Sequence, residues 1–321
     1  MIFDGFNCGS FRLSRPRKAR RSISATKAVK IRFIHTDMKF HQPKAELFIP
    51  DGADETAALS RITHLGIGAH QDDLEFMAFH GIIECFQNDN EWFGGVTCTN
   101  GAGSDRMGAY GCYSDEQIQD VRRQEQKIAA RIGRFGIMAQ LDYPSSVVKD
   151  SNHAELREDL IALLRATGPR VVYTHNPADK HETHIGVMVA AIEAMRALPH
   201  EQRPNVVHGC EVWRNLDWMC DSEKIAHDVG SHDHLAAALT GVFDSQIAGG
   251  KRYDLAVQGR WRANATFFES HAIDRAEGIA LAMDLTPLVH DDSLDVADYV
   301  DGFILRFRED VLTKLQKRLG R

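Results

Sequence analysis

The sequence predicts an α/β fold, a Rossmann-like and mainly parallel sheet with helices on both faces, followed by a helical C-terminal extension. Between residues 61 and 213, short apolar stretches alternate with helical patterns. This alternation is typical of βαβ units in a parallel sheet. From Ser231 onward, helical patterns dominate. A chain of 321 residues is long enough to bury a large core without cross-links.

The apolar stretches predict five strands, at residues 61–70, 92–99, 136–143, 170–174 and 206–213. Each is short, as buried parallel strands are, and Pro144 ends the third. Short alternating stretches at residues 31–34 and 46–49 predict an N-terminal arm or edge strands.

Helical patterns occupy the segments between these strands, at residues 76–87, 115–135, 154–167 and 182–198. Ser114 or Asp115 is a natural N-cap for the second helix, and Gly168 with Pro169 ends the third. A long amphipathic helix at residues 295–319 ends in basic residues, which suit a helix C-terminus. We expect this C-terminal region to pack on the same domain or on a second subunit.

Composition and charge exclude several classes of protein. No apolar run approaches the roughly 18 residues of a membrane span, so no spanning helix is expected. The net charge of −7 gives no overall attraction to nucleic acid. Residues 1–30 carry +7 and the remainder therefore −14, which predicts a disordered basic tail at the N-terminus. Six cysteines without CxxC spacing predict reduced thiols and a cytoplasmic protein.

The first cluster of reactive side chains is His70-Gln71-Asp72-Asp73-Leu74-Glu75, directly after the first predicted strand of the sheet. Ligands of parallel sheets bind beyond the carboxyl ends of strands. A strand-to-helix turn can bring His70 and Asp73 to one point, where they suit Zn²⁺ or a similar divalent ion. Asp72 could then take a proton from water. The alternative is a helix N-cap by Asp72 or Asp73 beside a core histidine.

The second cluster follows the fourth predicted strand and holds His175, His181 and His184 within ten positions. His181 and His184 share one face of the next helix's first turn. Both clusters follow parallel strands, so both can point at the same end of the sheet. Two histidines and one aspartate leave a coordination position open for water, as a catalytic zinc site requires.

These two stretches resemble a known family. AHQDDLEF (residues 69–76) resembles the AH-P-DD-x-E signature of the PIG-L/LmbE-like N-acetylglucosaminyl deacetylase family, and HNPADKHETH (residues 175–184) resembles its second motif. The family's R-x-x-E-x-x-x-A-x-x-x-G helix is matched by Arg122, Glu125, Ala129 and Gly133.

The resemblance covers about residues 61–250, which we interpret as a metal-dependent deacetylase-like catalytic domain. On this interpretation, residues 1–30 form the tail, 31–60 the N-terminal arm and 251–321 the helical extension.

The resemblance also implies a reaction and its residues. The expected protein is a metal-dependent hydrolase that removes an N-acetyl or similar N-acyl group from an N-acetylglucosamine-type sugar or conjugate. His70, Asp73 and His184 would bind the metal, usually Zn²⁺. Asp72 would be the general base, and His181 would stabilise the oxyanion or protonate the leaving amine. The expected partner is a small amino-sugar substrate, and a homo-oligomer is compatible with the sequence.

Other positions are open to two interpretations. Arg106, in a Gly-rich loop, could reach the substrate or be solvated. Trp213 and Arg214 follow the fifth strand and could line a sugar pocket, although a tryptophan is usually buried in packing. Asp179 could orient a site histidine or cap a turn. Phe243 stands where the family commonly has a histidine, so one polar contact to the substrate could be missing.

The alternative function is a non-catalytic sugar- or metabolite-binding protein that retains the site. Against this alternative, each proposed site position holds a residue type that can perform its catalytic or metal-binding role. These positions are His70, Asp72, Asp73, His181 and His184. A dinucleotide-dependent oxidoreductase is disfavoured, because Gly66-Ile67-Gly68 lacks the third glycine of GxGxxG and lies inside the first strand.

Overall fold

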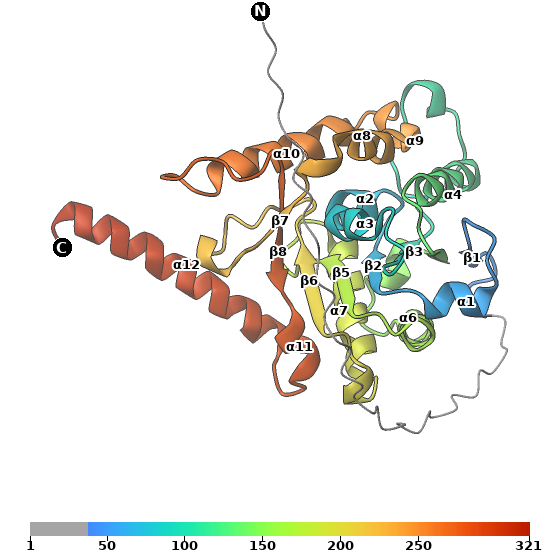
Figure 1. The fold of residues 1–321 in the computed structure, drawn as a ribbon, viewed down its shortest axis with the longest axis horizontal. Coiled ribbons are helices and arrows are strands. Elements are labelled where there is room, and N and C mark those ends of the chain that lie inside the picture. Colours follow the sequence, from blue (N-terminus) through green and yellow to red (C-terminus); the bar gives the residue numbers. More distant parts are fainter. Residues whose placement is uncertain (1–37) are drawn as a thin grey trace, which may run out of the picture. The chain divides into compact units, whose positions relative to one another are not determined.

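The computed structural model describes residues 38–321, which are built on an eight-stranded sheet (Figure 1). The strand order is β1-β4-β3-β2-β5-β6-β8-β7. Strands β4, β3, β2, β5 and β6 are parallel neighbours. At one edge β1 pairs antiparallel with β4, and on the other side β8 pairs antiparallel with both β6 and the edge strand β7. The strands are β1 (Glu46–Phe48), β2 (His64–Gly68), β3 (Phe93–Thr99), β4 (Ile137–Tyr143), β5 (Val171–His175), β6 (Val206–Cys210), β7 (Ile225–Asp228) and β8 (Ile279–Asp284). The predicted mainly parallel sheet is confirmed.

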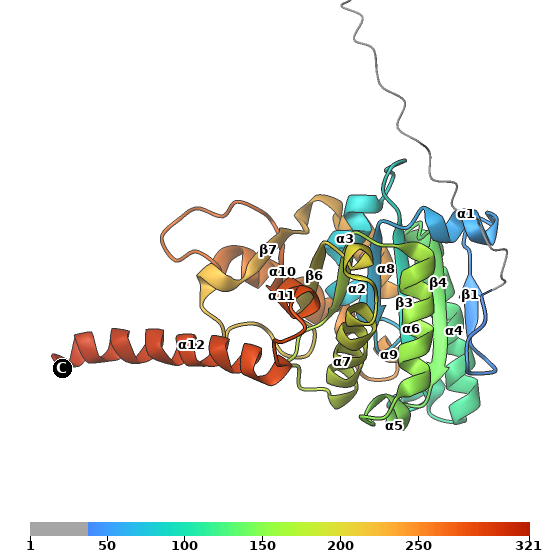
Figure 2. The ribbon, with the colours of Figure 1, turned by 90° about the horizontal axis from the view of Figure 1, so that it is seen from below.

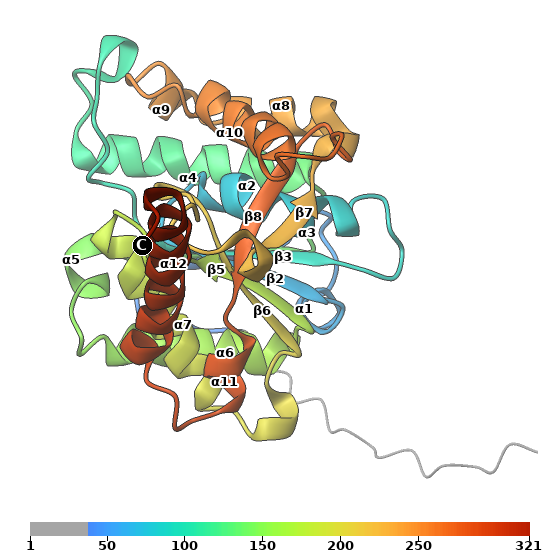
Figure 3. The same cartoon turned by 90° about the vertical axis from the view of Figure 1, so that its left-hand side faces the viewer.

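Helices cover both faces of the sheet, and each side has its own apolar core (Figures 1 and 3). One face carries α1 (Glu55–Ser60), α5 (Ser145–Val148), α6 (Ala154–Thr167), α7 (Glu182–Arg196) and α11 (Thr286–His290). The other carries α2 (Asp73–Met77), α3 (Phe79–Cys85), α4 (Asp115–Ile132), α8 (Asp233–Gly241), α9 (Asp244–Ile247) and α10 (Tyr253–Phe267).

The last helix, α12 (Val296–Leu319), starts on the sheet and then leads away from it (Figure 2). Asp295 caps it by accepting from two backbone N–H groups, and Tyr299 donates to the carbonyl oxygen of Asp284 at 2.8 Å. Phe303 is its one buried residue. The described helices include none with the length and apolar character to cross a membrane.

Most predicted elements are confirmed, and the differences have physical causes. The predicted helix at 76–87 is two helices, α2 and α3, which meet at Ala78. Strand β8 lies in a region expected to be helical, because its five consecutive apolar residues carry no periodicity that separates a buried strand from a buried helix. The edge strand expected at 46–49 is β1, whereas residues 31–34 and the basic tail lie outside the described residues.

The order of the strands places the functional segments. Strands β2 and β5 are neighbours in the sheet. The strand that follows β2 in the chain, β3, lies on the side of β2 away from β5, and the strand that follows β5, β6, lies on the side of β5 away from β2. Their carboxyl ends therefore flank the switch point of the sheet, where ligands bind in open α/β folds. His70 to Asp73 follow β2, and His175 is the last residue of β5.

Packing between α5 and α7 gives a testable consequence. A methyl group added at Gly186 would lie 2.4 Å from the carbonyl oxygen of Val148, which is backbone and cannot rotate away. We expect Gly186→Ala to lower the free energy of unfolding by about 1–3 kcal/mol in chemical denaturation. The control is Gly259→Ala on α10, where a methyl group meets nothing within 4 Å. That variant should be unchanged or more stable by up to about 1 kcal/mol, and equal losses in both variants would contradict this packing.

Candidate active site

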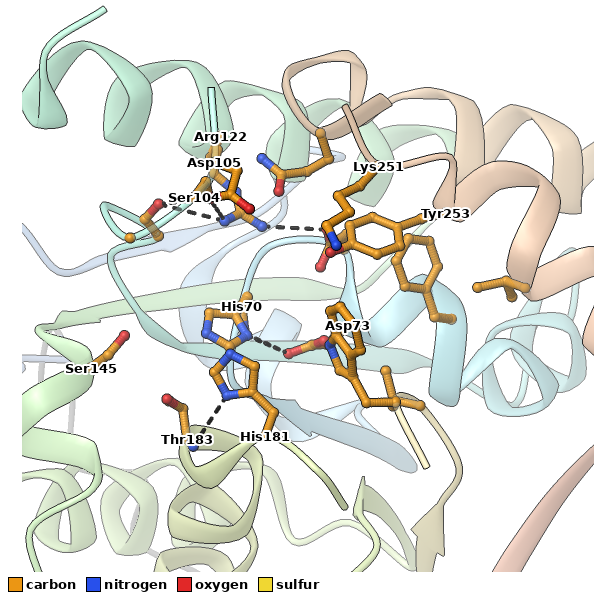
Figure 4. A pocket seen from close by; sticks show the side chains of 18 of the residues that line it. His70, Asp73, Ser104, Asp105, Arg122, Ser145, His181, Thr183, Lys251 and Tyr253 are labelled. Carbon is orange, nitrogen blue, oxygen red and sulfur yellow. Dashed lines mark hydrogen bonds and ion pairs between the residues drawn. The ribbon is translucent and has the colours of Figure 1, made fainter. Parts of the chain in front are cut away.

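A cavity of about 610 Å³ opens where the parallel strands end. Its lining residues come from the segments that follow β2, β3, β4, β5 and β6, together with α4 and α10 (Figure 4). His70, Asp72 and Asp73 line it from the first cluster, and His181 lines it from the second. The two clusters therefore converge, as their positions after parallel strands predict.

Donor atoms of three side chains meet at this junction. His70 Nδ1 lies 3.2 Å from His184 Nε2 and 3.3 Å from Asp73 Oδ2, and His184 Nε2 lies 3.4 Å from Asp73 Oδ1. Ligand atoms around a tetrahedral Zn²⁺ with bonds of about 2.0–2.1 Å are separated by about 3.3 Å. Two imidazoles and a carboxylate are also a donor set that zinc accepts. The chemistry and the spacing of these side chains fit a divalent cation.

His175 lies beside this group but is bound differently. Its Nε2 accepts the backbone N–H of Ala69 at 3.0 Å and lies 3.5 Å from Asp73 Oδ2. The accepting lone pair is therefore already used, which disfavours His175 as a metal ligand. Its ring stacks on His184 with centroids 3.9 Å apart, so it supports the position of that imidazole.

Asp179 fills both of the roles that the sequence left open. Its Oδ1 accepts the backbone N–H of His181 at 3.0 Å and so caps the turn before α7. Its Oδ2 accepts the backbone N–H of Trp213 at 3.1 Å and lies 3.6 Å from His184 Nδ1. Burial lowers the pKa of His184, but Asp73 and Asp179 outweigh burial and raise it.

Asp72 has an unusual backbone. Its φ of 106° lies in the left-handed region, which costs a non-glycine residue about 1–3 kcal/mol and is typical of functional sites. It occupies the N-cap position of α2 without a side-chain capping bond, so the alternative of a simple cap is not supported. Burial raises the pKa of Asp72 above its usual range, against the opposing charge of Arg122, whose Nη2 is 3.4 Å from Asp72 Oδ2.

His181 lies next to two of the proposed metal ligands, His70 and His184. Its Nδ1 accepts the backbone N–H of Thr183 at 3.3 Å, so the proton of the neutral ring is assigned to Nε2 (Figure 4). Its ring centroid lies 4.9 Å from that of His70 and 4.7 Å from that of His184. Burial lowers the pKa of His181, which favours this neutral form.

Of the three residues predicted to contact the substrate, only Trp213 lines the cavity. Trp213 lines the cavity and is 38% exposed. Arg106 is not among the lining residues, because its guanidinium donates to the carbonyl oxygens of Ala102 and Tyr113 and pairs with Asp115. Arg214 is also outside the lining. The sequence prediction therefore gains no support for these two arginines.

Several lining residues were not predicted as site residues. Arg122 stood in the motif helix but received no role, and Lys251 and Tyr253 belong to the region taken as an extension. Nothing local in the sequence shows that α10 folds over the cavity. Phe243 is buried against Phe76, with ring centroids 6.3 Å apart, and Gln246 from the following turn brings a polar side chain to the cavity instead.

Comparison with known proteins agrees with this geometry. The family model described as PIG-L, GlcNAc-PI de-N-acetylase, matches residues 65–195. Comparison with curated proteins finds no match.

Three solved structures illustrate the shared fold. A conserved protein from Thermus thermophilus has a TM-score of 0.54 at 16% identity, covering 73% of this chain and 100% of that one. The 4-carboxy-2-hydroxymuconate hydratase from Pseudomonas putida has a TM-score of 0.51 at 18% identity, and the match covers 70% of this chain and 96% of that one. The N,N'-diacetylchitobiose deacetylase from Pyrococcus horikoshii has a TM-score of 0.50 at 18% identity, and the match covers 72% of this chain and 88% of that one. At these identities the similarity shows the fold, and residues 65–195 match the PIG-L family model.

Proposed function

We propose that the protein is a divalent-metal-dependent hydrolase, with Zn²⁺ as the expected metal, that removes an N-acetyl or similar N-acyl group from an N-acetylglucosamine-type sugar or conjugate. The observation that carries this proposal is the convergence of His70, Asp73 and His184, with donor atoms 3.2–3.4 Å apart, beside a cavity that Asp72 and His181 also line. The PIG-L match and the deacetylases that share the fold support it. Because a hydratase also shares the fold, the fold alone does not select the reaction.

The proposed roles follow from the contacts of each side chain. A divalent cation held by the three donors would polarise an amide carbonyl and lower the pKa of a water molecule. The carboxylate of Asp72 lies next to those donors and accepts the proton of the attacking water. Arg122, at 3.4 Å, holds that carboxylate in place. Water oxygen then bonds to the carbonyl carbon, and the C–N bond breaks.

His181 is placed for the second half of the reaction. Its Nδ1 is occupied by the N–H of Thr183, so Nε2–H is the group free to donate to the carbonyl oxygen as negative charge develops there. The proton that Asp72 takes from water then passes to the leaving amine nitrogen, while the neutral His181 ring keeps its Nε2–H. Trp213, on the rim, offers an aromatic face for a sugar ring. The products are acetate and a free amino sugar.

Acetate release tests the proposal directly. The substrates are N-acetylglucosamine, its phosphate, N,N'-diacetylchitobiose and thiol-conjugated N-acetylglucosaminides, each with and without chelator. We expect release from at least one substrate, loss of that release with chelator and its recovery with added Zn²⁺. Tight binding of a sugar without any acetate release would instead favour a binding protein.

Asp72→Asn tests the general base. The amide keeps the shape of the side chain but cannot accept the proton, so kcat should fall by about 10²–10⁴-fold while bound metal is unchanged. Acetate release and elemental analysis on the same preparation check both parts. A variant that hydrolyses as fast as the parent would show that Asp72 is not the base.

His184→Ala tests the ligand set. Removing one of three protein donors should lower the metal content of the purified protein well below one equivalent, and activity should fall with it. His200→Ala is the matched control, since His200 is exposed and follows the far end of α7. Full metal content in the His184 variant would refute this ligand.

A further inference from the structure

One peptide unit beside the site is held at both ends by the same helix. The carbonyl oxygen of Gln71 accepts from Arg122 Nη2 at 2.5 Å, and the N–H of Asp72 donates to Gln126 Oε1 at 3.2 Å. Arg122 and Gln126 lie one turn apart on α4, and both are buried, Gln126 completely. Both polar groups of the peptide between Gln71 and Asp72 are therefore hydrogen-bonded to neighbouring side chains of a single helix.

The orientation of the Gln126 amide is fixed by its two partners. The backbone N–H of Asp72 can only donate, so the atom that faces it must be the amide oxygen. The amide nitrogen then points the other way, where it donates to Glu75 Oε1 at 2.9 Å. Glu75 is fully buried on α2. A single glutamine thus links the backbone of Asp72 to a buried carboxyl group one turn further along α2.

This link acts at the strained residue. Asp72 has a φ of 106°, whereas most residues other than glycine prefer a negative φ. Rotation about the N–Cα bond of Asp72 to a negative φ would relieve that strain, and it would change the direction of the Asp72 side chain relative to the Gln71–Asp72 peptide. Such a rotation breaks the bonds to Arg122 and Gln126 together. The two side chains of α4 therefore oppose the one relaxation that the backbone favours.

We propose that Gln126 is a positioning residue, which holds Asp72 in its left-handed conformation and thereby keeps the Asp72 carboxylate directed into the cavity. Its effect on the backbone follows from the contacts above. Its effect on the rate rests on the proposed function, in which Asp72 accepts the proton of water.

The experiment compares Gln126→Met with an exchanged pair and a control. Methionine cannot accept the Asp72 N–H, so the crystal structure should show Asp72 at a negative φ, and kcat should fall at least about tenfold with KM and metal content within about twofold. The pair Glu75→Gln with Gln126→Glu returns an acceptor to Asp72 and a donor to the new carboxylate. It should restore the positive φ and most of kcat. Gln124→Met, on the exposed side of α4, should change neither.

Each outcome decides the proposal. A positive φ at Asp72 in Gln126→Met overturns it, whatever the rate, and so does a negative φ with an unchanged kcat. If Gln126→Met does not fold, Gln126→Asn, which is one methylene shorter and still polar, takes its place with the same expected result. If the parent protein hydrolyses no substrate, the proposed function fails, and the φ of Asp72 in the variant still decides whether Gln126 holds the backbone.

Discussion

The carboxylate of Asp73, buried among imidazoles, is the interaction on which the rest of the site depends. Ring nitrogens of His70 and His184 lie 3.3 and 3.4 Å from its oxygens, and the backbone N–H of His70 donates to it at 2.6 Å. A carboxylate that is 3% exposed requires such partners, because burial of an unpaired charge is costly. Burial would raise the pKa of Asp73, but the neighbouring His184 holds it well below its usual range. This contact joins the segment after β2 to the segment after β5.

Around the Asp73 carboxylate, three segments of the fold contribute the other side chains of the proposed site. The turn after β2 carries Asp72, the start of α7 carries His181, and α4 approaches from the side with Arg122 and Gln126. The C-terminal region contributes to the cavity wall, because Lys251 and Tyr253 join Trp213 in its lining. The proposed metal donors and Asp72 therefore lie at the ends of strands and helices, whereas most of the rest of the cavity wall comes from residues 101–105, from Ser145 and Lys149, and from residues 212–260.

The sequence predicted those parts of the fold that local rules govern. Helix α6 spans the predicted residues 154–167, since Gly168 ends it at a φ of 54°. Ser114 caps α4 with a full capping box. The convergence of His70, Asp73 and His184 was predictable because parallel strands bring their carboxyl ends to one edge. The insertion of β8 beside β6 and the fold of α10 over the cavity depend on tertiary contacts that no local pattern encodes. Arg106 is held by contacts within its own loop, which the residue types alone do not reveal.

The central claim is that His70, Asp73 and His184 together bind one divalent cation, and X-ray absorption spectroscopy of the zinc-loaded protein tests it most directly. The account predicts only nitrogen and oxygen neighbours at about 2.0–2.1 Å, with the outer-shell scattering of two imidazoles, and the loss of that imidazole signal when His70 and His184 are both replaced by alanine. Sulfur in the first shell, or a spectrum without imidazole, would contradict it.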